Sequence, residues 1–278
     1  MTRSIQQIER DLAALSEQVT ALTEQLDRSY TQYLNVLGQS IQKQLTLASY
    51  QICTQTYPEA FLALSLNQRQ ALQHKIRQLG KEAQELLLLA LEGPERTAKA
   101  VEGDAIAPRE DAGDLELLPL DSESDSKLSE EETLASQETE PFDSPDRLLR
   151  SIQYIEQTIQ ETLQTLSSRA NLLLREAHIL PDRLPAKLME IAVQSEEARN
   201  SAGNSPNLLN LLVEAEDADS EKESAVMQVT AVRLRLSELE FADPRLGAER
   251  NQTRQLVARA RRLAKQFQKI QRELAIAR

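Results

Sequence analysis

Two histidines and one cysteine are the residues of this chain whose chemistry could support a metal site or nucleophilic catalysis. A helical di-iron site needs a Glu-x-x-His motif, whereas His178 stands only two residues after Glu176, and His74 is far away along the chain. Cys53 lies within a helical apolar pattern with no histidine near it in sequence, which favours a buried, inert thiol. We therefore expect no metal, no cofactor and no enzyme activity.

Other features of the sequence favour a soluble, cytoplasmic protein. A single cysteine excludes an internal disulfide and fits a reducing compartment. The first residues lack the apolar core of a signal peptide. The longest apolar run, residues 86–91, is far shorter than the roughly 20 residues that span a bilayer. Attachment to a membrane surface stays open.

The composition predicts an all-α fold. Only 3% of the 278 residues are aromatic, none is Trp, and Leu, Ala, Gln, Glu and Arg dominate. Sheets favour β-branched and aromatic residues, whereas Leu, Ala, Gln, Glu and Arg favour long helices. With few large side chains to bury, thin packing of two or three helices is expected.

An acidic tract divides the chain. Residues 93–146 hold 17 Asp or Glu against 4 Lys or Arg, whereas the net charge of the whole chain is −12. Such charge density with few bulky residues is typical of disorder. We therefore predict a coiled-coil and helical-hairpin domain over residues 1–92, a disordered acidic linker over 93–143 and a helical bundle over 144–278.

The N-terminal segment carries an a/d heptad seam that needs a partner helix. The polar flanking positions do not select that partner by charge. Self-association and packing on another segment of the same chain both satisfy the pattern. The seam consists of Ile5, Ile8, Leu12, Leu15, Val19, Leu22 and Leu26.

A helical hairpin should follow the seam. Pro58 ends the first helix, because the residue before a proline avoids helical angles. Ser65 and Gln68 resemble a capping box, which predicts a second helix over 66–91. Tyrosines 30, 33, 50 and 57 could form a ligand platform, but packing inside a thin bundle explains them more simply.

The C-terminal segment predicts an antiparallel bundle of five helices. Ser144 and Pro145 form the first helix start. Pro185 and the pair Ser205-Pro206 each begin a shorter helix. Apolar residues at helical spacing cover 225–239. The pair Asp243-Pro244 then precedes a last helix whose apolar seam runs from Thr253 to Leu274.

That last helix is strongly basic. Residues 245–278 hold ten Lys or Arg and two Glu. A basic outer face can bind the phosphates of nucleic acid or anionic lipid, attract the acidic linker, or simply keep the helix solvated. No aromatic residue interleaves the cations, so a stacking platform for single strands is missing. The residues opposite the apolar seam are Arg254, Arg261, Arg262, Lys265, Lys269 and Arg272.

Three stretches resemble a family of uncharacterised cyanobacterial helical proteins. They are YQICTQTYPEAFLALSLNQRQ at 50–70, PNLLNLLVE at 206–214 and LRLSELEFADPRL at 234–246. That family has no assigned activity, so the resemblance implies a helical, cytoplasmic protein and assigns no functional residue.

Two functional hypotheses follow. The first is a non-catalytic, oligomerising adaptor or scaffold that contacts itself and another protein through its coiled coil and bundle. The alternative is binding of nucleic acid or an anionic membrane surface through the basic face of the last helix. Neither hypothesis requires a small-molecule substrate.

Overall fold

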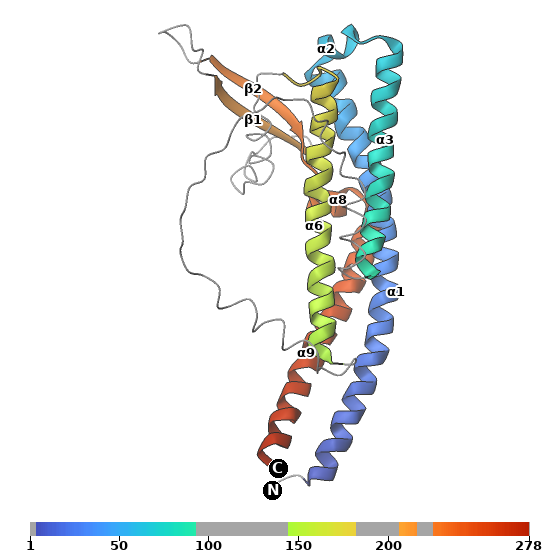
Figure 1. Cartoon of the computed structure of the whole chain (residues 1–278), viewed down its shortest axis with the longest axis vertical. Helices are drawn as coiled ribbons and strands as arrows, with labels where there is room; N and C mark the ends of the chain where they lie inside the picture. Colours follow the sequence, from blue (N-terminus) through green and yellow to red (C-terminus); the bar gives the residue numbers. More distant parts are fainter. Residues whose placement is uncertain (1–3, 93–143, 182–205, 216–224, 278) are drawn as a thin grey trace, which may run out of the picture.

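The computed structural model describes residues 4–92, 144–181, 206–215 and 225–277, so the predicted disordered linker at 93–143 lies outside the described residues. The expected all-α fold and its long N-terminal helix are confirmed. Four long helices run up, down, up and down along one axis (Figure 1). They are α1 (Ile5–Gln51), α3 (Leu66–Leu89), α6 (Pro145–Glu176) and α9 (Pro244–Ala277).

The expected hairpin joins α1 to α3. A π-helical turn (Ile52–Thr56) and the short helix α2 (Pro58–Ala63) make the corner, and a 3₁₀ turn (Ala90–Glu92) follows α3. Ser65 and Gln68 form the predicted capping box. Gly38 and Gly80 lie where α1 and α3 approach closely, since a Cβ at Gly38 would stand 2.7 Å from Cβ of Gln84.

The N-terminal and C-terminal segments share one core. The second half of α1 packs on α3, the first half packs on α9, and α6 packs against both α3 and α9 (Figure 1). One cluster of buried residues runs from Leu15 on α1 through Ile159 on α6 to Phe267 on α9. The sequence leaves open whether the two segments touch. In the structure they pack together and form a single hydrophobic core.

Helix α6 begins at the predicted start, Ser144 and Pro145. The Ser144 side chain caps it by accepting from the backbone N–H of Arg147. At the other end His178 adopts a left-handed conformation with φ of 55°. Its N–H donates to the Arg175 carbonyl, and that of Ile179 donates to the Leu174 carbonyl, which closes a Schellman motif.

Two of the predicted helices are wrong. Residues expected to be helical form an antiparallel hairpin of β1 (Leu208–Ala215) and β2 (Ala225–Val232), in which Leu208 pairs with Val232. The apolar run of β1 is too short to distinguish a strand from a buried helix by periodicity. In β2, Val and Thr favour a strand, and their spacing matches a helical stripe by coincidence. The helix predicted from Pro185 lies outside the described residues.

Asn171 anchors the hairpin to α6. Its buried side-chain amide donates to the Val232 carbonyl at 2.9 Å and accepts from the Val232 N–H at 2.7 Å. Ser167, one turn earlier, accepts from the N–H of Leu234 at 2.9 Å. These bonds satisfy the backbone where β2 ends, before the short helix α8 (Leu236–Ala242) leads into α9.

Candidate anion-binding face

Helix α9 presents two different faces. Asp243 precedes it and accepts from the Arg245 N–H, and Pro244 starts the helix. Thr253, Ala260, Leu263 and Phe267 are buried on the side that packs on α1. The predicted cations occupy the other side, and all six are exposed: Arg254, Arg261, Arg262, Lys265, Lys269 and Arg272.

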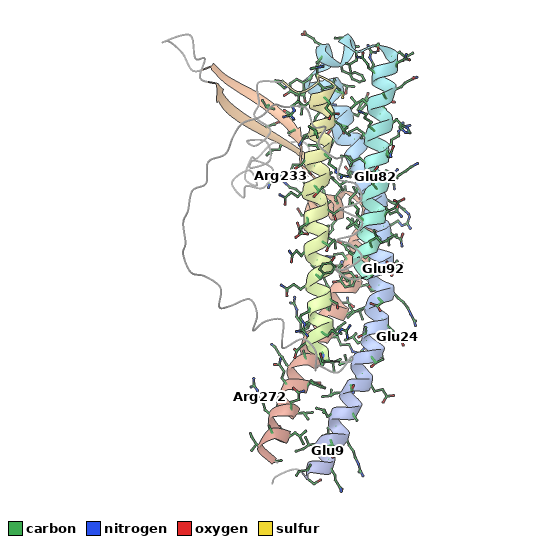
Figure 2. All side chains as sticks on the ribbon, viewed as in Figure 1. Glu9, Glu24, Glu82, Glu92, Arg233 and Arg272 are labelled. Carbon is green, nitrogen blue, oxygen red and sulfur yellow. The ribbon has the colours of Figure 1, made fainter. Side chains whose placement is uncertain are left out.

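These cations form a stripe, which we call the α9 stripe. Residues 254–272 contain seven Lys or Arg, including Arg259, and no Asp or Glu. At 100° per residue, Arg254, Arg261, Lys265 and Arg272 lie within about 40° of one another, along about 27 Å of helix. Figure 2 shows Arg272 pointing away from the α1–α9 pair.

The stripe has few internal partners. Arg254 contacts Glu240 at 3.2 Å. Within the described parts of the chain, the other cations of the stripe have no ion-pair partner. Like charges three or four residues apart, such as Arg261 and Lys265, destabilise a helix by about 0.2–0.5 kcal/mol per pair. The α9 stripe therefore carries uncompensated repulsion that an external anion would relieve.

A buried polar network holds the N-terminal end of the α9 stripe, next to Arg254, against the bundle. Arg250 on α9 donates to both carboxylate oxygens of Glu156 on α6, at 2.5 and 2.6 Å. Its Nε lies 3.2 Å from Glu240 of α8, and its guanidinium stacks on the Tyr33 ring. Tyr30 donates to Glu156 at 2.8 Å. This network joins α1, α6, α8 and α9.

The network holds its members in defined charge states. Burial raises the pKa of Glu156, but the hydrogen bonds and charge of Arg250 outweigh burial and lower that pKa below its ordinary value. Burial and the neighbouring Glu156 carboxylate raise the pKa of the Tyr30 phenol. Glu156 is thus ionised and Tyr30 neutral at neutral pH, so the ion pair is structural, and Arg250 is not available to a ligand.

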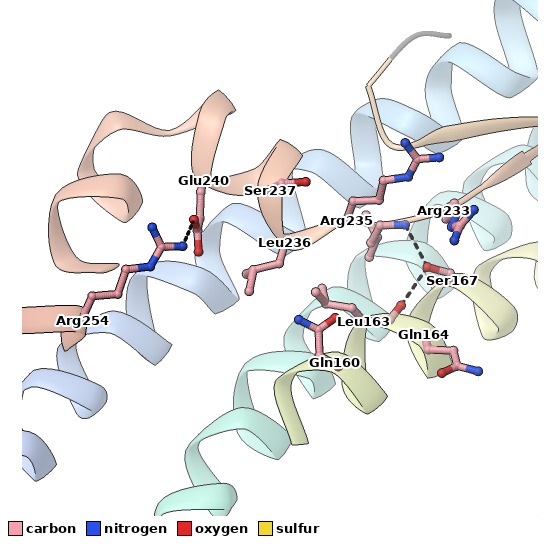
Figure 3. A pocket seen from close by; sticks show the side chains of 11 residues that line it. Gln160, Leu163, Gln164, Ser167, Arg233, Arg235, Leu236, Ser237, Glu240 and Arg254 are labelled. Carbon is pink, nitrogen blue, oxygen red and sulfur yellow. Dashed lines mark hydrogen bonds and ion pairs between the residues drawn. The ribbon is translucent and has the colours of Figure 1, made fainter. Parts of the chain in front are cut away.

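A polar cleft of about 610 Å³ lies beside the network, between α6 and residues 233–240 (Figure 3). Arg254 and Glu240 form one end of its lining, and Gln160 and Gln164 of α6 line its floor. Arg233 and Arg235 line the other end. Arg235 also pairs with Glu238 at 3.2 Å. The cleft thus has arginines at both ends, and Arg254 and Arg235 are each paired with a glutamate.

The structure places most of the predicted N-terminal seam against α9 of the same chain. Ile8, Leu15, Val19, Leu22 and Leu26 are buried, and Leu12 is partly buried. Ile5, at the tip, is 40% exposed. The exposed surface expected of an oligomerisation seam is therefore largely used within one molecule.

The remaining predicted residues do not form one site. Cys53 is buried, and burial raises the pKa of its thiol to about 11. His74 is exposed on α3, and His178 is exposed in the turn after α6. Tyr30 and Tyr33 pack inside the bundle, Tyr57 accepts from the N–H of Thr230, and Tyr50 is 61% exposed. The four tyrosines therefore do not gather into a platform.

Sequence reasoning missed the Arg250 network. The residues come from positions far apart in the chain, and each also fits an ordinary surface or seam position. Tyr33 carries the one available signal, because it is a large polar-tipped side chain beside an apolar stripe.

Among the described residues, no group of three or more His, Cys, Asp or Glu could hold a metal ion. No helix in the same residues combines the length and apolarity that a membrane crossing needs.

Comparison with known proteins identifies no match. No family model matches the chain, and neither a curated protein nor a solved structure is similar to it. The resemblance to cyanobacterial helical proteins therefore stays a prediction.

Proposed function

We propose that this protein is a non-catalytic adaptor whose α9 stripe binds the phosphate groups of a polyanion. The observation that carries the proposal is the exposed run of seven cations without an acid over residues 254–272. Arginine supplies five of the seven, and its planar guanidinium matches phosphate in a bidentate geometry.

Rigidity of the scaffold supports the proposal. The buried side of α9 packs on α1, where Ser29 and Thr253 share a hydrogen bond of 3.0 Å and Gln32 donates to Glu249 at 2.7 Å. The stripe therefore lies on a fixed helix, so binding does not require the helix backbone to become ordered, which would cost entropy.

The packing of α9 also limits the mode of binding. Because Leu263 and Phe267 are buried against α1, the apolar face of α9 is not free to enter a bilayer. Contact with a membrane would therefore be electrostatic and confined to lipid headgroups. Contact with nucleic acid would be made to its sugar-phosphate backbone. Both modes predict strong salt dependence.

The test compares phosphate sources with the full-length protein. A short DNA duplex, a single strand of the same length, and vesicles with and without phosphatidylglycerol are titrated at low and moderate salt. Binding to one anionic source, weakened by salt and by Arg261→Glu with Lys265→Glu, supports the proposal and names the source.

The matched control carries Arg77→Glu and Lys81→Glu on α3, which change the net charge by the same amount. If the control weakens binding as much as the stripe variant, net charge rather than the stripe is responsible and the proposal fails. Absence of binding to every probe also rejects it.

A further inference from the structure

An apolar groove lies between the C-terminal part of α1 and the N-terminal part of α3, at the end of the bundle opposite the C-terminus of α9. The groove encloses about 400 Å³. Lys43, Leu47 and Tyr50 of α1 form one wall, and Leu72, Ile76 and Arg77 of α3 lie opposite. The three α1 residues follow a spacing of four and three, so they line one helix face over about 10 Å.

Bulky apolar side chains surround the groove but stay in contact with solvent. Leu47 is 48% exposed and Tyr50 is 61% exposed, while Leu62 and Leu66 at the adjoining corner are 65% and 68% exposed. Isolated exposed apolar residues are ordinary, but a cluster around a concave surface is typical of an interaction site.

The floor contains a buried hydroxyl without a partner. Ser49 lines the groove and is 6% exposed, and no group in the described residues hydrogen-bonds to its Oγ. Helical serines usually donate to the carbonyl four residues earlier, as Thr46 does to Gln42. A buried polar atom left unsatisfied is unfavourable by about 1–3 kcal/mol, so the floor of the groove is polar at Ser49.

The groove has a cationic end and an apolar end. A Cβ at Gly80 would lie 3.1 Å from Cα of Gln42, so residue 80 stands beside residue 42. Because α1 and α3 are antiparallel, Arg77 and Lys43 lie together at that end, and Tyr50 and Leu72 lie at the other. Both cations are exposed, and neither has an ion-pair partner in the described residues.

We propose that this groove binds an amphipathic helical segment of an acidic partner protein. Two bulky apolar side chains of the segment, three or four residues apart, enter between Tyr50, Leu72 and Ile76. A carboxylate about two turns along the segment meets Lys43 and Arg77. Exposed Leu62 and Leu66 beyond the groove favour a protein over a small amphiphile, which a pocket normally encloses.

The test selects ligands without assuming a sequence. A library of random peptides displayed on yeast cells, free of exposed nucleic acid, is selected against labelled full-length protein, and recovered peptides are measured by fluorescence anisotropy. We expect an apolar pair followed or preceded at about two turns by Asp or Glu. Bound peptide should also protect Cys53, which lines the groove, from a thiol reagent.

Variants locate the binding. Leu47→Asp and Arg77→Glu should each weaken it by about tenfold or more. Leu172→Asp, at an exposed apolar residue of α6 outside the groove, and Lys81→Glu, at an exposed cation of α3, should leave it unchanged. Arg261→Glu with Lys265→Glu should also leave it unchanged, which separates this site from phosphate binding by the α9 stripe.

Four results would overturn the proposal. They are a basic consensus, binding indifferent to Leu47→Asp and Arg77→Glu, protection of Cys53 by dodecanoate but by no peptide, and protection that grows with protein concentration alone. The third indicates a fatty-acid site, and the fourth a contact between two copies. Because both substituted side chains are exposed, unchanged circular dichroism confirms that each variant is folded.

Discussion

Arg250 and Glu156 form a two-pronged ion pair that joins α9 to α6, with both guanidinium nitrogens within 2.6 Å of carboxylate oxygens. The Arg250 side chain is 11% exposed. The Nε of the same guanidinium lies 3.2 Å from Glu240, so a single side chain contacts two carboxylates, and Arg254 of the stripe also contacts Glu240.

Replacing Arg250 with Met should strongly destabilise the fold. The substitution keeps the aliphatic stem but leaves Glu156 and Glu240 without their shared cation. Breaking a buried pair on one side destabilises proteins by about 3–5 kcal/mol, and partial exposure of Glu156 reduces this to about 2–4 kcal/mol. Urea unfolding measures the loss. Lys75→Met removes a solvent-exposed pair with Glu176 and should change stability by less than about 1 kcal/mol.

Acid should weaken the same contact. The pKa of Glu156 is lower in the folded protein than its ordinary value of 4.5. Its stabilising contribution is therefore complete above that ordinary value and is lost as the pH falls through the lowered pKa. The difference in free energy of unfolding between wild type and Glu156→Gln should shrink over that acidic range. A difference that stays constant from neutral pH to well below the ordinary pKa would contradict the ion-pair assignment.

Gly38→Ala should destabilise the protein although alanine is the better helix former. The substitution gains about 1 kcal/mol of helix propensity. The new Cβ, however, meets Cβ and Cγ of Gln84 at 2.7 Å and its Cα at 3.0 Å. Forcing α1 and α3 apart is expected to cost about 1–3 kcal/mol. Gly247→Ala, whose Cβ would have its nearest neighbour at 3.5 Å, is the control and should be neutral or stabilising in thermal unfolding.

Asn171→Ala should release the β-hairpin from the bundle. The substitution orphans both backbone groups of Val232 in a buried setting, and each unsatisfied group is worth about 1–3 kcal/mol. Hydrogen exchange should show faster exchange of the amides of β2, with α1 and α3 unchanged. Ser168→Ala, next to the Ser167 that bonds Leu234, serves as the control. Uniform loss of protection over all helices would mean that the hairpin is not a separate unit.

The intact chain should sediment as a monomer at low concentration. Ile8, Leu15, Val19, Leu22 and Leu26 already pack within the molecule, which leaves little of the seam for a second copy. A fragment of residues 1–92 lacks α9 and should therefore associate even if the full-length protein does not. Analytical ultracentrifugation of both separates the cases. A stable full-length dimer would restore the oligomerising adaptor predicted from the heptad pattern.

Local rules predicted the helix boundaries well. Ser65 with Gln68 and Ser144 with Pro145 mark helix starts through bonds within one turn, and the structure has both. Exposure of the α9 cations also follows from helical periodicity, because Thr253 to Phe267 define the buried side.

Contacts between distant segments could not be predicted in the same way. A heptad seam specifies a partner helix but not whose helix it is, and α9 turned out to supply it. Arg250 and Glu156 stand 94 residues apart, and neither has a local signature. The hairpin was missed because Leu208 to Val213 is a short, mostly apolar run, whose conformation depends on its pairing with β2 rather than on its own pattern.

The most direct test of the central claim is the salt dependence of polyanion binding by full-length protein and by the Arg261→Glu, Lys265→Glu variant. The logarithm of the association constant is plotted against the logarithm of salt concentration, with the anionic source that binds best. If the α9 stripe holds phosphates, the wild-type slope should be steep, and loss of two contacts should reduce its magnitude, by about 2 when the source is duplex DNA. Equal slopes for the two proteins would contradict the account.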